Sequence, residues 1–407
     1  MCRWNIQELG KVSSIHNGST PSTSVEEFWN GNIIWITPKD LSEQNRKYIE
    51  KGERYITKKG LSKVKSKLLP KGTLLLSSRA PIGLLSIAKN ELVTNQGFKN
   101  IIVDENQISN EFLYYYLKLK VKELNNLGTG TTFKELSKSS LEKFKVKLPD
   151  LPTQQKIASV LSALDDKIEL NNRINAELEA MAKTLYDYWF VQFDFPNEEA
   201  NPYKSSGGKM VYNETLKREI PEGWEVKTVG ELVNIFDSKR IPLSKSEREK
   251  KKGIFPYYGA TEIMDYINDF IFDGEYILLA EDGSVMNSEG FPILQYIYGK
   301  TWVNNHAHVL QSKQIEYTEY LYKLLEMIPV ILIKSGSIQM KINQDNLLNY
   351  KLLVAPETLI LKYSKFAKSI RQKLIQNQKQ NQELSALRDW LLPMLMNGQV
   401  KVGEIIL

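Results

Sequence analysis

Lysine and arginine side chains crowd one stretch of the chain and offer a clear chemistry, the binding of phosphate groups. The stretch runs from Lys39 to Lys71, is expected to be a loop, and also carries Tyr48 and Tyr55. Cationic groups spaced this closely neutralise phosphates, which dominate nucleic-acid affinity without specifying a sequence. A solvated charged surface is the alternative interpretation. Within the stretch, the residues that we expect to contact phosphate are Lys58, Lys59, Lys63, Lys65 and Lys67.

Two further side chains in this half of the chain have the chemistry for reading base edges. Arg79 lies beside a proline and a glycine in SSRAPIG, so its guanidinium could present two donors to a guanine or a phosphate. Gln96 in TNQGFK could pair both amide groups with adenine, and Gly97 would let the backbone come close. An internal salt bridge for Arg79 and a buried turn amide for Gln96 are the alternatives. Lys99, which closes the same motif, joins the candidates.

Small residues and hydroxyl groups in GTGTTF, at 128–133, would also suit a phosphate. A glycine-rich loop by itself is weak evidence, so a plain turn is an equal alternative. The candidates in this loop are Thr131 and Thr132. The later segment SGSIQMK aligns with TGTTFKE, which gives Ser337 and Lys341 the corresponding role.

The second half of the chain offers its own candidates. Lys239 and Arg240 begin a basic run that ends at Lys252, for which a disordered polar loop is the alternative. Paired tyrosines before Gly259 could stack on or hydrogen-bond a base, or could be packing residues. NNHAHV replaces TNQGFK, and the different side chains imply a different target. The candidates of this half are Lys239, Arg240, Lys250, Lys251, Tyr257, Tyr258, Asn305 and His306.

Metal and catalytic chemistry find little support in the sequence. His306 and His308 alternate along an expected strand and so share a face, but no third ligand is near them in the sequence, and hydrogen-bonded strand histidines are commoner than ligands. One cysteine excludes internal disulfides, and three histidines give no zinc spacing. The chain has neither a GxxxxGK[ST] loop for ATP nor the Asn/Asp-Pro-Pro-aromatic motif of an adenine methyltransferase. We therefore expect no catalytic residue and no bound metal or cofactor.

Composition places the chain among ordinary folded proteins. With 407 residues, 42% apolar and 25% charged, two or three domains are expected. The start of the chain lacks an export signal and no long apolar run follows, so we expect a cytoplasmic protein. Residues 1–150 hold 24 Lys+Arg against 15 Asp+Glu, a net charge of +9, whereas residues 201–355 hold 18 against 20, a net charge of −2. Polyanion binding is expected chiefly of the first segment.

The elements that must position these residues follow from hydrophobic spacing. Short apolar runs separated by turn residues predict strands, and a longer periodic run predicts a helix. In the first half, strands are predicted at 32–37, 73–78, 83–88, 99–103 and 144–148, with a helix at 111–119. In the second half, strands are predicted at 275–280, 292–298, 308–311 and 350–354. The polar, turn-rich segment after Pro196 is predicted to be a surface connection.

Two long helices are predicted at 153–190 and 357–397 from apolar residues at three-four spacing. An offset of 206 residues places one helix on the other and superposes the segments before them, so the chain is a domain plus a helix, twice. Asparagines interrupt both apolar stripes at matched positions, and a buried asparagine fixes register and partner. The register residues are Asn171, Asn175, Asn377 and Asn381. We expect an α+β protein in which two globular domains are separated by an antiparallel coiled-coil pair with pseudo-two-fold symmetry.

The sequence resembles the specificity subunit of type I restriction-modification systems. The resemblance lies in LPKGTLLLSSRAPIGLLSIA (69–88) and TNQGFK, in FPYYGATEIMDYINDFIFDGEYILLAEDG (255–283), and in both helical segments. It implies target recognition domains at 1–150 and 197–355, with a central spacer helix at 151–196 and a distal one at 356–407. It also implies a non-catalytic DNA reader in which each domain binds half of a bipartite target while the helices set the spacing.

The resemblance further implies partners: double-stranded DNA, methyltransferase subunits that dock on the helices, and restriction and translocase subunits. S-adenosylmethionine, ATP and magnesium are then expected on those partners. Two alternatives stay open from the sequence. One is a coiled-coil adaptor that organises proteins without reading bases, which leaves the charge of the first segment unexplained, and the other is the specificity module of another restriction type.

Overall fold

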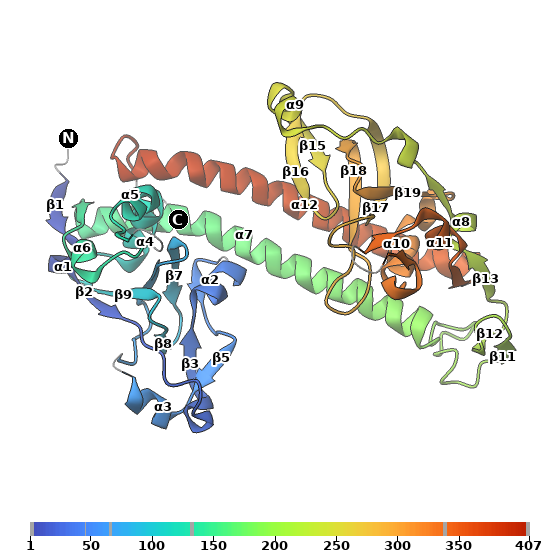
Figure 1. Cartoon of the computed structure of the whole chain (residues 1–407), viewed down its shortest axis with the longest axis horizontal. Helices are drawn as coiled ribbons and strands as arrows, with labels where there is room; N and C mark the ends of the chain where they lie inside the picture. The colour runs from blue at the N-terminus through green and yellow to red at the C-terminus, as the bar shows by residue number, and fades with distance from the viewer. Residues whose placement is uncertain (1–3, 45, 65–66, 131–133, 337–339, 404–407) are drawn as a thin grey trace. The chain divides into compact units, whose positions relative to one another are not determined.

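The computed structural model describes residues 4–44, 46–64, 67–130, 134–336 and 340–403 (Figure 1). The chain forms two compact units, one made of Met1–Arg173 with Asn377–Leu407 and the other of Ile174–Gln376. Each unit therefore combines a globular domain with part of both long helices. Among the helices of the described residues, none has the length and apolar character needed to cross a membrane.

The first unit is built around a five-stranded sheet in the order β2-β9-β6-β7-β4, beside a three-stranded sheet in the order β5-β3-β8. Every residue of β6 is buried, the two serines that end it as well as its three leucines, and the strand pairs antiparallel with β9 and β7 on either side. The strands are β1 (Asn5–Glu8), β2 (Ser13–Asn17), β3 (Trp29–Ile36), β4 (Tyr48–Ile49), β5 (Arg54–Ile56), β6 (Leu74–Ser78), β7 (Ile82–Ala88), β8 (Leu92–Thr94), β9 (Phe98–Val103) and β10 (Lys145–Leu148). The helices are α1 (Leu9–Val12), α2 (Pro38–Gln44), α3 (Lys58–Lys63), α4 (Asn110–Leu119), α5 (Val121–Asn126) and α6 (Lys138–Glu142).

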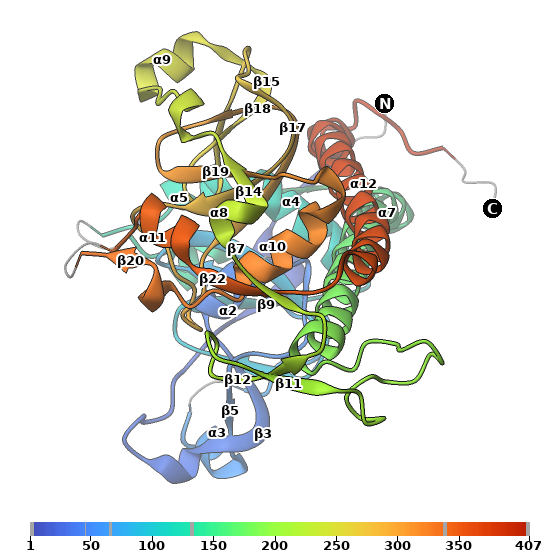
Figure 2. The same cartoon turned by 90° about the vertical axis from the view of Figure 1, so that its right-hand side faces the viewer.

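The second unit has a six-stranded sheet in the order β14-β19-β17-β18-β15-β16, with α10 packed beside it (Figure 2). Its strands are β11 (Met210–Asn213), β12 (Arg218–Pro221), β13 (Glu225–Thr228), β14 (Val233–Ile235), β15 (Lys252–Tyr258), β16 (Ile263–Ile267), β17 (Phe272–Ala280), β18 (Leu294–Val303), β19 (Ala307–Ser312), β20 (Lys334–Ser335), β21 (Lys341–Ile342) and β22 (Lys351–Val354). Its short helices are α8 (Val229–Leu232), α9 (Lys245–Lys250), α10 (Thr318–Glu326) and α11 (Gln344–Asn349).

The strands predicted from apolar runs are confirmed, from β3 in the first unit to β22 in the second, and so is the helix at 111–119 as α4. The prediction of a mere surface connection after Pro196 is partly wrong. That segment forms the antiparallel hairpin of β11 and β12, and it delivers Ile220 and Trp224 to the core of the second unit. Because this segment is mostly polar, the sequence did not indicate that these two apolar residues are buried.

The long helices are α7 (Leu151–Tyr186), extended by a π-helical turn (Asp187–Val191), and α12 (Glu357–Met396) (Figure 1). Their antiparallel pairing is confirmed within each unit. In the first, Asp165 contacts Arg388; in the second, Ala182 packs with Ile370 and Leu374. The cores of both globular domains continue onto these helices, because apolar residues of α7 and α12 belong to the same buried clusters as the sheet residues.

The internal repeat is confirmed by matching backbone pairings. β10 and β22 are separated by 206 residues, and each pairs antiparallel with an earlier strand of its own domain, β10 with β1 and β22 with β13. The Thr129–Glu135 bridge recurs at the same offset as the Ser335–Lys341 pairing of β20 and β21. The two domains therefore share these backbone pairings as well as their sequence pattern, although their sheets differ in strand number.

Candidate nucleic-acid interface

Three strands of the first domain end around one polar hollow. Asn17 at the end of β2 pairs with Lys99 at the start of β9, and the backbone amide of Ser78, at the end of β6, donates to Gly97. The amide of Leu136 in turn donates to the carbonyl oxygen of Ser78, which brings Glu135 to the same place. The hollow has a volume of about 500 Å³ and is lined by Ile15, His16, Asn17, Gly18, Ser19, Lys67, Gln96, Lys99, Glu135 and Lys138.

The hollow is electropositive. Lys67, Lys99 and Lys138 line it, and the ammonium of the buried Lys99 lies 3.1 Å from the carboxylate of Glu135, the single acidic side chain among the lining residues. Burial lowers the pKa of His16, and the positive charges of Lys67 and Lys138 lower it further. Three lysines against one carboxylate favour an anion in the hollow, and phosphate is the anion that such a group of lysines fits.

Gln96 lies at the edge of this hollow with an exposed side chain. Its carbonyl oxygen accepts a hydrogen bond from the hydroxyl of Thr20, which leaves the amide nitrogen as the group that can donate to a ligand. The tight approach of the two loops needs Gly18, where a Cβ would lie 1.8 Å from the carbonyl oxygen of Asn95. The loop after β2 therefore holds Gln96 in place.

Arg79 stands half-buried in the turn between β6 and β7. Within the part of the chain that the structure describes, its guanidinium forms no ion pair, so the internal salt bridge considered from the sequence is not present there. The candidates Lys65, Thr131, Thr132 and Ser337 lie outside the described residues.

The basic stretch from Lys39 to Lys71 is not a loop, which corrects the expectation. It contains α2, β4, β5 and α3, and α3 begins at a Thr57 cap whose hydroxyl accepts from the amide of Gly60 at 3.0 Å. Lys58 and Lys63 are exposed on α3, and Lys67 follows it. Lys59 is exposed too, but its ammonium lies 2.5 Å from the carboxylate of Glu27.

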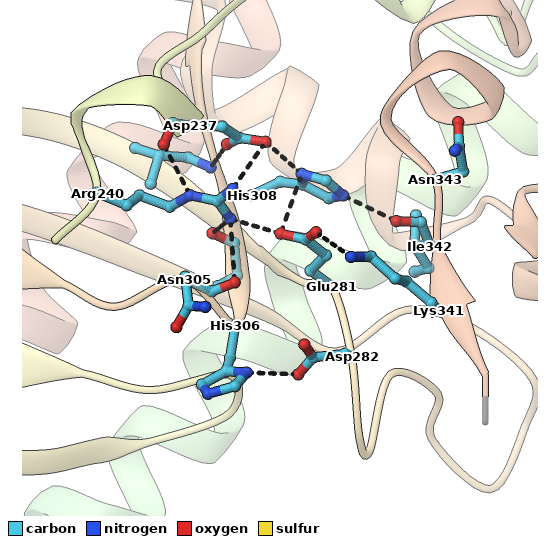
Figure 3. A network of polar contacts seen from close by, with 12 residues as sticks. Asp237, Arg240, Glu281, Asp282, Asn305, His306, His308, Lys341, Ile342 and Asn343 are labelled. Atoms are coloured by element: carbon cyan, nitrogen blue, oxygen red, sulfur yellow. Dashed lines mark hydrogen bonds and ion pairs between the residues drawn. The ribbon is translucent and has the colours of Figure 1, made fainter. Parts of the chain in front are cut away.

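The second domain carries a repeat-equivalent site with different chemistry (Figure 3). By strand pairing, the equivalent residues are Asn17 and Asp237, Ser78 and Glu281, Lys99 and His308, and Glu135 and Lys341. His308 contacts Asp237 at 2.6 Å through Nδ1 and the carbonyl oxygen of Ile342 at 3.0 Å through Nε2. Its two ring nitrogens thus both face oxygen acceptors.

Arg240 is bound within this second site by other residues of the domain, which corrects the expectation that it contacts phosphate. Its guanidinium donates to Glu281 at 2.5 Å and to the carbonyl oxygen of Ala307 at 2.7 Å, and its side chain is 12% exposed. Lys341 is exposed, but it also contacts Glu281, at 2.9 Å. Burial alone would raise the pKa of Glu281; hydrogen bonds from Arg240 and Lys341 and the charge of His308 outweigh it and lower that pKa.

Although no third ligand lies near His306 and His308 in the sequence, the fold brings two carboxylates beside His308. Ligand atoms of Asp237, Glu281 and His308 all lie within 4.8 Å of one another, although Asp237 is far away in the sequence. The position that an ion would take is contested by Arg240 and Lys341, which already neutralise the carboxylates. Both ring nitrogens of His308 already face oxygen atoms of the chain, so a metal could reach Nδ1 only by displacing the contact with Asp237.

Tyr257 is a packing residue, and its expected contact with a base is corrected. It is 1% exposed, packs with Ile267 and Trp302, and its hydroxyl accepts from the amide of Leu243 at 2.9 Å. Tyr258 is half-buried, and burial raises its pKa to about 12.

The remaining candidates of the second domain lie at its surface. Lys239, Lys250, Asn305 and His306 are exposed. The ring of His306 contacts Asp282 at 2.7 Å, on the strand end that carries Glu281 (Figure 3). Lys251 is half-buried, 3.7 Å from Asp269 and over the ring of Trp302.

The asparagines of the helix pair are placed close to their expected partners. Asn171 is buried and donates to Asn381 at 2.9 Å and to Gln380 at 2.8 Å. Asn381 donates in turn to Asn172 at 2.8 Å. Asn377 is buried on α12.

The sequence did not single out His16, Lys138, Asp237 or Glu281 as site residues. They come from strand ends and turns spread over more than one hundred positions in each domain, for example from His16 to Lys138. The repeat offset was the signal that could have linked the copies, because it aligns Glu135 with Lys341.

A family model described as "Type I restriction modification DNA specificity domain" matches residues 1–180 and 221–358. These two matches correspond to the two copies of the repeat. The chain belongs to the type I restriction-modification specificity subunit family.

Two relatives match this family member over nearly its whole length. The MjaIX specificity subunit of Methanocaldococcus jannaschii is 34% identical, covering 99% of this chain and 94% of its own. The HindI specificity subunit of Haemophilus influenzae is 23% identical, covering 91% and 94%. The crystal structure of the type I S subunit from M. genitalium shares the fold, with a TM-score of 0.61 at 19% identity over 97% of this chain and 96% of that one. This specificity subunit is a DNA-recognition component, and in type I systems catalysis is carried by the partner subunits.

Proposed function

We propose that each recognition domain of this specificity subunit binds one half of a bipartite DNA target through the strand-end site described above. The observation that carries the proposal is the pair of repeat-equivalent sites, in which the same backbone positions carry Lys99 and Glu135 in one domain and His308 and Lys341 in the other. A shared frame with different side chains is what reading two different half-sites requires.

The first domain supplies most of the electrostatic attraction. Its hollow is lined by Lys67, Lys99 and Lys138, and the exposed Lys58 and Lys63 lie on the neighbouring α3 segment. These groups contact phosphates, while Arg79 and Gln96 contact bases or the adjacent backbone. In the second domain, the exposed Asn305 and His306 take the base-reading position, and Lys239 and Lys250 contact phosphates.

The helices α7 and α12 each continue from one unit into the other, and we propose that they set the distance between the half-sites and dock methyltransferase subunits. Restriction and translocase subunits complete the assembly, and S-adenosylmethionine, ATP and magnesium are bound by these partners. The DNA target places this assembly in the cytoplasm. An adaptor that does not read bases would leave the electropositive hollow of the first domain without a role.

Mapping of methylated adenines in DNA from cells that carry this chain and its methyltransferase subunits tests the proposal. The expected result is methylation at one bipartite sequence with a fixed spacer. A chimera in which 197–355 is replaced by the same region of another specificity subunit should change one half-site and leave the other. Methylation that ignores sequence, or a chimera that changes both half-sites, would refute the assignment.

A further inference from the structure

A buried ion pair joins α10 of the second globular domain to the long helix α12. The guanidinium of Arg371 donates from Nε to both carboxylate oxygens of Glu319, at 3.1 and 3.3 Å, and from Nη2 to Oε2 at 3.2 Å. The side chains are 19% and 7% exposed. Figure 2 shows one end of α10 close to α12, the two helices that the pair joins.

Two aromatic rings enclose the arginine. The guanidinium carbon lies 4.3 Å from the ring centre of Tyr296 on β18 and 5.0 Å from that of Tyr322 on α10. A planar cation held by a carboxylate and two rings accepts only a narrow range of orientations. Sheet, short helix and long helix are thus joined through one side chain.

The carboxylate depends on its partner. Burial raises the pKa of Glu319, and the charge of Arg371 opposes that rise. Without the guanidinium, a buried carboxyl group would be left unpaired, which is far less favourable than the pair. Loss of either partner therefore leaves a buried polar group without its counterpart.

The first domain meets its helices through a different set of polar groups at the equivalent place. Glu111 is the second residue of α4, as Glu319 is of α10, and it contacts Lys47 at 3.3 Å. The position of Arg371 is taken in α7 by Asp165, which accepts from Tyr115 of α4 at 2.6 Å and from Arg388 at 2.7 Å. Lys47, which the sequence assigned to the basic DNA-binding stretch, is buried here and donates to Ser162 of α7 at 2.6 Å.

We propose that the Glu319–Arg371 pair, with Tyr296 and Tyr322, is a positioning element that fixes the orientation of the second recognition domain on the helices and so determines which spacer length the DNA target must have. The inference rests on the proposed function, because spacer length has meaning only for a bipartite reader. Arg371 and Glu319 act through the domain they hold and contact no DNA themselves.

The test compares DNA duplexes whose mapped half-sites are separated by the native spacer or by spacers one or two base pairs shorter or longer. The protein is the full chain in complex with its methyltransferase subunits, and the readout is the relative affinity across the series. Arg371→Lys keeps the charge but loses the paired hydrogen bonds, and Glu319→Gln keeps the shape but loses the charge. Thermal unfolding of each complex reports whether a variant is folded.

The matched control is Lys368→Gln, since Lys368 also joins α12 to the second domain. Its ammonium lies 3.6 Å from Glu275, but the two side chains are 46% and 32% exposed, and exposed pairs contribute little. We expect the wild-type complex and the control to bind the duplex with the native spacer about tenfold more tightly than duplexes with shorter or longer spacers. One misplaced set of base contacts costs about that much affinity. Arg371→Lys and Glu319→Gln should each reduce that ratio to about threefold or less, because the domain then tolerates a misplaced half-site at lower cost.

Uniform weakening on all spacers, with the wild-type ratio kept, would overturn the positioning role and leave Arg371 as a stabilising residue only. If Glu319→Gln fails to fold, Arg371→Lys decides by the same criterion. If the wild-type complex itself shows no spacer preference, the proposed bipartite function fails, an outcome distinct from failure of the positioning role.

Discussion

Asn171 donates a hydrogen bond from its side-chain amide to the side-chain oxygen of Asn381, 2.9 Å away, where α7 and α12 pair in the first unit. A second bond from the same amide reaches Gln380 at 2.8 Å. Because Asn171 is 1% exposed, its amide has no water to replace these partners. A shift of either helix along the other would break both bonds, which ties the register of the pair to this contact.

Replacing Asn171 by leucine should lower the free energy of unfolding by about 1–3 kcal/mol, because the side-chain oxygen of Asn381 loses its donor in a partly buried setting. Urea unfolding of the wild type and the variant measures the difference. Asn172→Ala is the control, since Asn172 is exposed and should change stability by no more than about 0.5 kcal/mol. Equal effects of the two substitutions would contradict the role of Asn171.

Replacing all four register residues, Asn171, Asn175, Asn377 and Asn381, by leucine should keep the protein folded and loosen the helix register. Leucines pack without a directional bond, so neighbouring registers become closer in free energy. Methylation of targets with altered spacers by the assembled complex measures this. An unchanged spacer preference and unchanged docking of methyltransferase subunits would argue against the polar layer as the determinant of register.

Lys67→Gln and Lys138→Gln should each weaken DNA binding and make it less dependent on salt. If each lysine neutralises one phosphate, the slope of log affinity against log salt concentration should fall in magnitude by about 0.9 per substitution. Titrations of a labelled target at several salt concentrations give the slope. Lys89→Gln is the matched control, because Lys89 does not line the hollow and its ammonium is paired with Glu50 at 2.5 Å, closer than the 3.5 Å between Lys138 and Glu142. A slope that stays at the wild-type value in the Lys67 and Lys138 variants would remove this hollow from the interface.

Glu281→Gln should destabilise the second domain at neutral pH, and the difference from the wild type should vanish in acid. The pKa of Glu281 in the folded protein lies below the ordinary value of 4.5, so its charge stabilises the fold above pH 4.5, and this contribution is lost as the pH falls through the lower folded value. At pH 7 the loss of its charge-assisted hydrogen bonds should cost about 1–3 kcal/mol. Unfolding curves measured between pH 7 and pH 3 test the sign. A difference that grows in acid would contradict it.

Tyr257→Phe should lower stability by about 1 kcal/mol and leave DNA affinity unchanged, since the hydroxyl is held by the amide of Leu243 in a buried setting. The neighbouring Tyr258→Phe is the comparison, because Tyr258 keeps part of its surface exposed. Affinity for the mapped target and the unfolding midpoint are measured for both. Loss of affinity with unchanged stability in Tyr257→Phe would instead indicate that Tyr257 contacts DNA.

Local patterns in the sequence determined the elements and the duplication. The apolar run that begins β6, the three-four stripes of α7 and α12, and the offset of 206 residues each depend on spacing along the chain, and these features are found in the fold. The sequence also indicated the family, because the motifs that carry the resemblance are contiguous segments of the chain. Asn171 and Asn381 were singled out because polar residues interrupt a stripe at matched depths.

Tertiary structure alone decided which charged side chains face solvent. Lys47 and Lys63 belong to one basic stretch, yet Lys47 is buried against Glu111 and Ser162 while Lys63 is exposed on α3. Arg240 stood in a basic run and is held by Glu281, whose place beside it comes from the pairing of β17 with β19. The physical reason is that a charge takes its role from the partner that neutralises it, and these partners come from segments that only the folded chain brings together.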